Sequence, residues 1–308
     1  HSGDSSCTLP VMSLEGSVIE KVRAHAVKIG KELKLSGFLN IQMALYQNEI
    51  YILEVNPRAS RTLPFVCKAT GFDWVRAGVH GMLGRTFKEQ RLQPPPVHPN
   101  AFKHYSVKEV VFPFLKFPGV DVLLGPEMKS TGEVMGVGED FAEAFMKGLL
   151  AAGQRMPKSG TVFVSVKDSD KPRVLEICSK LKMLGYRIIS THGTAQFLRS
   201  HGIVCSGINK VKEGQPHIVD AIINGQVDML INTTDGDTAV SDSFSIRRSA
   251  LQVGVPYFTT LTAAKASVHS LSRWIRGEMD VRPLQQLGST TRIQHSPKDA
   301  DLGKVQKL

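Results

Sequence analysis

The chain has 308 residues, enough for about two domains of ordinary size. Hydrophobic residues make up 42% and charged residues 21%, and no apolar run reaches the roughly 18 residues of a membrane-spanning helix. The net charge is +10, but lysines and arginines are scattered rather than gathered with aromatic residues, which favours phosphorylated small molecules over nucleic acid as ligands. The four cysteines lie far apart and match no zinc spacing, so free thiols in a reducing cytoplasm are expected.

The first 100 residues predict a helix, a β-hairpin and further helix. Apolar residues recur at helical spacing from Leu14 to Leu35, and again from Phe65 to Met82. Between these segments, two runs rich in Ile, Leu and Tyr flank residues 47–49, which predicts a hairpin with a three-residue loop. Residues 91–100 contain four prolines and predict an extended surface connection. The chain opens on His1 rather than Met, which we interpret as a cut inside a longer protein.

A strand and a helix are predicted to complete the first domain. The strand lies in HYSVKEVVFPF, which begins at His104, and the helix runs from Phe141 to Ala152. The polar turn GQRMPKSG follows this helix. We therefore place the domain boundary between residues 153 and 154.

From Thr161 onward, strand-like and helical segments alternate. The strand-like runs are TVFVSV, YRIIST, VDMLINTT and VPYFTTL, and the helical segments are Lys171 to Leu184, Gln215 to Asn224, Ser243 to Val253 and Ala263 to Ile275. This alternation predicts right-handed βαβ crossovers and a doubly wound parallel sheet over residues 154–284. Residues 285–308 are polar with few large apolar groups, which predicts a mobile tail.

The string ILEVNPRASR carries a candidate metal site. Glu54 and Asn56 are two residues apart on a strand, so their side chains point to one face and offer oxygen ligands to Mg²⁺. Gln42 lies opposite Glu54 if the hairpin register makes paired residue numbers sum to 96. Arg58 and Arg61 follow the strand and could grip a phosphoryl group. The alternative is that these are solvated polar residues at a strand end.

A candidate phosphate site lies in the second domain. THGTA follows a predicted strand and opens a helix, which brings the hydroxyls of Thr191 and Thr194 to free backbone N–H groups. INTTDGD follows another parallel strand and adds polar groups at the same sheet edge. The further candidates are Asn232, Thr233, Thr234, Lys171 and Lys210. Alternatively, the threonines and asparagine are turn formers and helix caps.

EVNPRASRT, with its hairpin and Gln42, resembles the ATP-grasp signature of carbamoyl phosphate synthetase large chains. HSGDS, FVCKATG, the stretch from HYSVKEVVFPF to LLGPEMKSTGEVMG, THGTA and INTTDGD match the same family in the same order. The resemblance covers nearly the whole chain up to the tail. It implies a mixed α/β fold, in which the C-terminal half of an ATP-grasp α+β domain is followed by a methylglyoxal-synthase-like regulatory domain.

In this family, one ATP-grasp half phosphorylates bicarbonate and the other phosphorylates carbamate, and the order of domains matches the second half. The resemblance implies that His1, Ser2, Gln42 and Glu54 bind ATP, that Gln42, Glu54 and Asn56 bind metal, and that Arg61 and Arg58 are catalytic. The metal would be Mg²⁺ or Mn²⁺, and the family leaves room for K⁺.

The resemblance also implies two effector sites. A nucleoside monophosphate, UMP as inhibitor or IMP as activator, would meet Ser165, Lys171, Thr191, Thr194, Lys210, Asn232 and Thr234. Ornithine, the activator in bacterial members, would meet Asp4, Glu109, Leu124, Tyr257 and Thr259.

The expected partners are a glutaminase small chain, ATP and carbamate, in a cytoplasmic ligase of pyrimidine and arginine biosynthesis that can assemble as an oligomer of heterodimers. No nucleic acid or membrane partner is expected, and the isolated piece is expected to lack turnover. One alternative is an effector-binding module without catalysis. Another is a lyase using Asp235, Asp237 or His192, which would leave the first 150 residues without a purpose.

Overall fold

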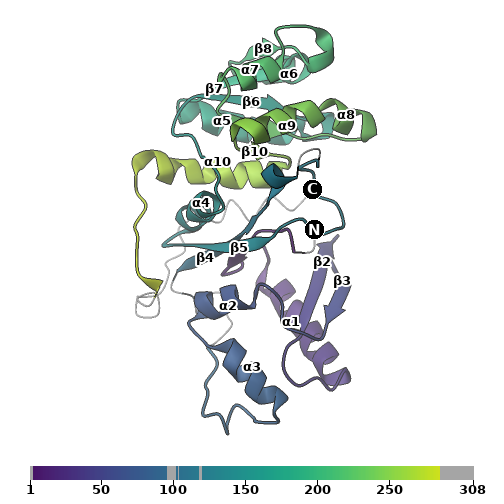
Figure 1. The fold of residues 1–308 in the computed structure, drawn as a ribbon, viewed down its shortest axis with the longest axis vertical. Helices are drawn as coiled ribbons and strands as arrows, with labels where there is room; N and C mark the ends of the chain where they lie inside the picture. The colour runs from purple at the N-terminus through teal and green to yellow at the C-terminus, as the bar shows by residue number, and fades with distance from the viewer. Residues whose placement is uncertain (1–2, 96–101, 103, 118–119, 285–308) are drawn as a thin grey trace. The chain divides into compact units, whose positions relative to one another are not determined.

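The computed structural model describes residues 3–95, 102, 104–117 and 120–284 (Figure 1). These residues form two compact units, built mainly from residues 3–108 and 109–280, and the chain passes between them within one strand. The units are defined by packing, and the predicted domain boundary at 153/154 stays a prediction. None of the helices in the described ranges is long and apolar enough to cross a membrane.

The first unit contains the predicted hairpin and helical segments. Its elements are β1 (Cys7–Leu9), α1 (Gly16–Glu32), β2 (Asn40–Tyr46), β3 (Glu49–Asn56), α2 (Leu63–Thr70) and α3 (Trp74–Met82). The prediction of continuous helix up to Met82 is wrong, because Gly71 adopts a left-handed conformation with φ +66° and ends α2. Asp73 then starts α3 by accepting a hydrogen bond from the backbone N–H of Arg76 at 2.9 Å.

The turn between β2 and β3 corrects one expectation and confirms another. Gln47 and Asn48 have φ values of +48° and +66°, so the strands are joined by a two-residue turn with two left-handed residues, not by a three-residue loop. The register then shifts between Gln42 and Met43. This irregularity restores the predicted pairing, and Gln42 lies opposite Glu54.

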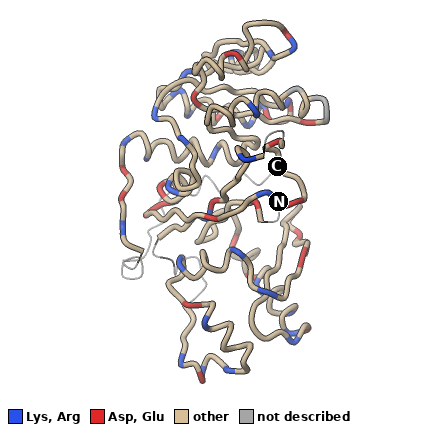
Figure 2. The backbone as a smooth tube through the Cα atoms, in the orientation of Figure 1, with Lys and Arg blue, Asp and Glu red and all other residues tan. Residues whose placement is uncertain are grey.

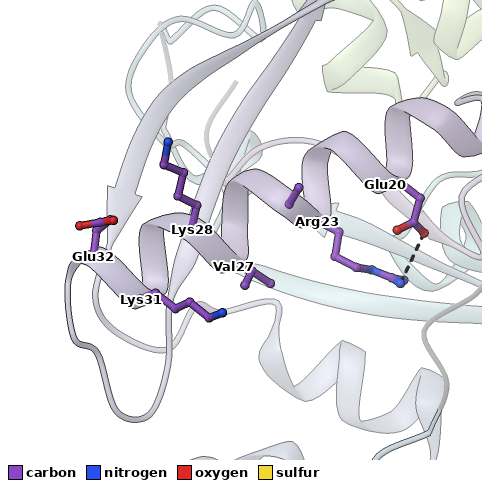
Figure 3. Close-up of a pocket in the computed structure, with 7 residues that line it drawn as sticks. Glu20, Arg23, Val27, Lys28, Lys31 and Glu32 are labelled. Carbon is purple, nitrogen blue, oxygen red and sulfur yellow. Dashed lines mark ion pairs between the residues drawn. The ribbon is translucent and has the colours of Figure 1, made fainter.

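Helix α1 forms as predicted but buries only Val18 within the described chain. Its outer side lines an open hollow, which Figure 3 shows with the charged side chains extending away from the helix axis. Arg23 and Glu20 form an ion pair at 3.4 Å there, and both side chains are exposed. Surface pairs of this kind contribute little to stability.

The second unit begins in β4 (Tyr105–Val111), the predicted strand. It continues through the 3₁₀ helix η2 (Phe114–Lys116), β5 (Gly132–Gly138) and α4 (Phe141–Ala151). The Val111 carbonyl accepts the N–H of Thr131 at 2.9 Å, directly before β5. The sequence analysis missed β5, and its Gly-rich sequence is the reason, because glycine is depleted in ordinary strands.

A five-stranded parallel sheet forms the rest of this unit. Its strands are β6 (Thr161–Ser165), β7 (Arg187–Thr191), β8 (Ser206–Ile208), β9 (Met229–Asn232) and β10 (Tyr257–Phe258), in the order β10-β9-β6-β7-β8. The chain moves outward from β6 to β8 and then returns to the other side of β6. This confirms the doubly wound sheet and puts its topological switch point between β6 and β9.

The helices of this domain follow the predicted alternation (Figure 1). They are α5 (Lys171–Met183), α6 (His192–Ser200), α7 (Ile218–Ile223), α8 (Asp237–Asp242), α9 (Phe244–Val253) and α10 (Leu261–Arg276), with 3₁₀ turns at Asp168–Asp170 and Val211–Glu213. Phe163 and Leu230 pack with α7 and α9 in one fully buried cluster. Strand β8 and helix α8 were not predicted.

Helix α10 packs against α4 and α5. Asp140 caps α4 by accepting the N–H of Glu143 at 2.9 Å, and it also forms an ion pair with Arg273 of α10. On the side facing α5, the Nδ1 atom of His269 lies 2.9 Å from the Nζ atom of Lys180. Charged and polar contacts therefore stabilise the packing of α10 against both α4 and α5.

His269 makes the stability of this unit depend on pH. Burial, and then the charge of Lys180, lowers the pKa of His269 to about 4, while an unfolded histidine titrates near 6.5. The unfolded chain therefore binds the proton more readily. The stabilising contribution of the neutral imidazole is fully present above pH 6.5 and falls as the pH drops toward 4.

In urea titrations, the unfolding free energy of wild type should therefore fall between pH 7 and pH 4.5. The unfolding free energy of His269→Gln should fall by about 1–2 kcal/mol less over the same range, after allowance for partial solvent screening. Parallel curves for the two proteins would contradict this, and exposed His201→Gln is the control.

Candidate functional site

The hairpin brings three candidate metal residues together. Glu54 lies exposed on β3, and the Nδ2 atom of Asn56 donates a hydrogen bond to its Oε1 atom. The two side chains therefore share a face, as the spacing predicted. Gln42 is the register partner of Glu54 on β2.

These residues fit part of a Mg²⁺ site. Glu54 supplies a carboxylate, and the two amides supply carbonyl oxygens, the donors that Mg²⁺ takes alongside waters and phosphates. The Asn56 amide nitrogen donates a hydrogen bond to Glu54. The amide group must therefore rotate before its oxygen can bind the same metal as Glu54. Among the described residues, no group of three or more His, Cys, Asp or Glu side chains could hold a metal ion. A metal held by the hairpin residues would need its remaining ligands from ATP and water.

The two candidate arginines differ in their contacts. The Nη2 atom of Arg61 donates to the Gly3 carbonyl at 2.6 Å, which holds this half-buried side chain beside the start of the chain. Arg58 is exposed and donates a local hydrogen bond to the Ala59 carbonyl at 3.1 Å. The predicted nucleotide contacts His1 and Ser2 lie outside the described residues. The side chain of Arg61 is therefore held in place more firmly than that of Arg58.

The second candidate site lies at the switch point of the parallel sheet. Ser165 ends β6 and is the register partner of Asn232, which ends β9. The Ser165 hydroxyl lies 3.0 Å from that of Thr191 at the end of β7, and the Asn232 amide donates to the Ser165 carbonyl at 3.2 Å. The buried Oδ1 atom of Asn232 has no hydrogen bond partner within the described part of the chain. Three adjacent strand ends thus present a polar cluster with an unused acceptor.

The alternative interpretation of these threonines as helix caps is not supported at Thr191. Thr191 stands at the N-cap of α6, but its side chain makes no capping hydrogen bond. Thr194 is buried on the same helix and accepts the N–H of Val166 at 3.4 Å. The N-terminus of α6 therefore carries no side-chain cap and faces the strand ends.

Two lysines supply positive charge to this site. The Nζ atom of Lys171 lies 2.7 Å from the Oδ1 atom of Asp168, and 3.9 Å from where a Cβ on Gly193 would stand, at the start of α6. Lys210 is exposed at the start of the Val211–Glu213 turn. The hydrogen bond and charge of Lys171, with a smaller contribution from Lys210, hold the pKa of Asp168 below its usual value. Asp168 therefore offsets the charge of Lys171, one of the two cations that an anionic ligand would use.

The sequence analysis overlooked Lys167 and Asn209 at this edge. The Lys167 N–H donates to the Thr233 hydroxyl at 3.1 Å, and its Nζ atom lies 3.5 Å from Asp235. Asn209 lies 3.0 Å from the Nε2 atom of His192. The charged run KDSDK directly after β6 was the available signal for Lys167.

The remaining candidates in this domain are Thr234 and the three residues considered for a lyase. Thr234 is half-buried after Thr233. Of the groups named for a lyase, Asp235 is bound by Lys167 and His192 by Asn209, while the Asp237 side chain lies outside the described part.

The expected ornithine contacts are distributed over both units. Asp4 is buried in the first unit, and the others, Glu109, Leu124, Tyr257 and Thr259, belong to the second. Burial, together with the charge of Asp121, raises the pKa of Tyr257. Their role stays a prediction.

The chain matches two family models and several curated proteins. Residues 1–90 match the family described as carbamoyl-phosphate synthase L chain, ATP binding domain, and residues 173–259 match the MGS-like domain. The chain is 48% identical over 286 residues to the carbamoyl phosphate synthase large chain of Myxococcus xanthus, covering 93% of this chain and 26% of that protein. It is 50% identical over 288 residues to the large chain of Pasteurella multocida, with coverage of 93% and 26%.

The fold and these family matches thus define the end of an ATP-binding synthase domain joined to an MGS-like domain. The chain belongs to the carbamoyl phosphate synthase large chain family and corresponds to its C-terminal part. It spans about a quarter of the length of the curated relatives it matches.

Proposed function

We propose that the chain serves a ligase that makes carbamoyl phosphate from bicarbonate, glutamine-derived ammonia and two ATP, for pyrimidine and arginine biosynthesis in the cytoplasm. Its first part carries the metal and ATP strand of the carbamate-phosphorylating site, and its MGS-like domain binds effectors. The observation that carries this proposal is the combination of the Gln42–Glu54 pairing with the polar switch point in one chain of this family. A glutaminase small chain is the proposed partner, in an oligomer of heterodimers.

At the catalytic strand, Gln42, Glu54 and Asn56 would hold Mg²⁺ or Mn²⁺ together with the phosphates of ATP, with His1 and Ser2 at the nucleotide. When bound, the metal would offset the negative charge that develops during phosphoryl transfer. Arg61 has a long, cationic side chain held at one end of this strand by the Gly3 carbonyl. We assign it to the transferred phosphoryl group, and Arg58 to a secondary role.

At the regulatory site, a nucleoside monophosphate such as UMP or IMP would place its phosphate at the start of α6, between Lys171 and Lys210. The hydroxyls at the ends of β6 and β7 and the unused acceptor of Asn232 suit the rest of the nucleotide. Such a ligand must displace Asp168 from Lys171. Ornithine would be the second effector, through the acids and hydroxyl predicted above. A second candidate function, an effector-binding module without catalysis, describes the isolated chain.

Calorimetry with UMP and IMP on the 308-residue chain tests the regulatory assignment. Lys210→Ala should raise the dissociation constant by about 5- to 150-fold, the effect of losing about 1–3 kcal/mol from a charge-assisted contact. Asp168→Asn should tighten binding, because it removes the carboxylate that competes for Lys171. Lys182→Ala, on the last turn of α5 and far along that helix from Lys171, is the matched control and should bind normally. A folded chain that binds neither nucleotide would refute the assignment.

A further inference from the structure

A buried arginine outside both proposed sites makes a bidentate ion pair. Arg247 of α9 is 2% exposed, and its Nε and Nη2 atoms donate to the two carboxylate oxygens of Asp121, with Nε 2.9 Å from Oδ1. Nη2 also donates to the Val240 carbonyl of α8 at 3.0 Å. One guanidinium group therefore holds two segments that are more than 100 residues apart in the sequence.

The two segments each lead to a predicted effector contact. Val240 lies in α8, which starts directly after the loop that follows Asn232 at the switch point. Asp121 begins the loop that contains Leu124, and its Oδ1 atom also accepts the N–H of Leu123 at 3.2 Å. Lys129 closes this loop by donating to the carbonyls of Asp121 at 3.3 Å and Leu123 at 2.7 Å.

The start of the loop is therefore held by the Asp121 carboxylate, and its end by Lys129. The same carboxylate lies close enough to Tyr257 for its charge to act on the phenol, which belongs to the predicted amino-acid effector contacts. A change in the position of the Asp121 carboxylate would alter its hydrogen bond to the Leu123 N–H. It would also alter the effect of the Asp121 charge on the Tyr257 phenol.

The guanidinium is also incompletely paired. Its Nη1 atom is buried and has no hydrogen bond acceptor among the described residues. A buried donor without a partner lowers the stability of this arrangement.

We propose that Arg247 is a positioning residue that transmits occupancy of the switch-point nucleotide site, through α8, to the Asp121–Lys129 loop. The inference rests on the proposed regulatory function. Arg247 touches neither ligand: it acts by holding Asp121 and α8 in one geometry. Lysine cannot replace it, because an ammonium group cannot bind both carboxylate oxygens and the Val240 carbonyl in a planar fork.

Hydrogen exchange on the full 308-residue chain, with and without saturating UMP, tests the proposal. In wild type, UMP should change the exchange rate of backbone amides 120–131 by about fivefold, the lower end of typical coupling between sites. Arg247→Lys should bind UMP with an affinity within about threefold of wild type, yet lose the response of the loop. Arg248→Lys makes the same substitution at the adjacent position, where no such ion pair exists, and should respond as wild type does.

Each outcome is decisive. A purely structural role would lower the thermal stability of Arg247→Lys but leave its loop response intact, and that result would overturn the proposal. UMP binding by wild type without any response in the loop would overturn it as well, while leaving the proposed function standing. Failure of the folded wild type to bind UMP would overturn both. If Arg247→Lys does not fold, Asp121→Asn is read in the same way, because that side chain is partly exposed.

Discussion

Glu54→Gln, made in a full-length large chain that carries this segment, is expected to abolish ATP-dependent formation of carbamoyl phosphate. Glutamine keeps the size of the side chain but removes the only carboxylate in the set formed with Gln42 and Asn56. If Glu54 is the charged metal ligand proposed above, its loss should cost about 4 kcal/mol of transition-state stabilisation, or roughly a thousandfold in rate.

The fold should be unaffected by this change, because Glu54 is exposed on the hairpin. Glu49→Gln is the matched control: it removes an exposed carboxylate from the same strand, beside the turn, and should leave turnover unchanged. Carbamoyl phosphate synthesis is measured with bicarbonate, ammonia and ATP at saturating Mg²⁺. Turnover of Glu54→Gln close to wild type would remove the metal assignment.

Gly136→Ala is expected to destabilise the second unit by about 3 kcal/mol, the upper end of the usual cost of overpacking. A Cβ atom at this position in β5 would lie 2.0 Å from the Ala144 carbonyl oxygen and 2.5 Å from the Gly148 nitrogen, both in the backbone of α4. Because these are backbone atoms, relief requires the strand and helix to move apart. Most of α4 is buried, so the whole helix would be disturbed.

Gly132→Ala tests the same substitution in the same strand without the clash. Its Cβ would meet only the Val111 Cβ at 3.8 Å, an ordinary contact. Urea denaturation of both variants should show a clear loss of unfolding free energy for Gly136→Ala and a change within about 1 kcal/mol for Gly132→Ala. Equal stability of the two variants would show that the close approach of β5 and α4 is not as described.

The hairpin illustrates how a local pattern can predict a residue pairing for the wrong reason. The alternating strands predicted that Glu54 and Asn56 share a face, because side chains alternate along any strand. The pairing of Gln42 with Glu54 was also correct, but it arises from a two-residue turn followed by a register shift between Gln42 and Met43. Neither feature leaves a clear signature in the residue pattern.

The second domain was predicted more completely, since alternating strands and helices allow few topologies. Two short elements were not predicted: β8 has three residues, too few to show periodicity, and α8 directly follows a glycine turn. The helix break at Gly71 was not predicted either, because the apolar spacing continues across it.

The sequence by itself determined the class of fold, the polar strand ends and the resemblance to a family, because these depend on residues that are close together along the chain. Only the tertiary structure showed that Arg247 is buried against Asp121, 126 residues away in the sequence. Such a pair joins separate segments, and its partners are selected by how the strands and helices pack. The charge of a side chain can be read from the sequence, but the group that compensates it inside the protein depends on the packed fold.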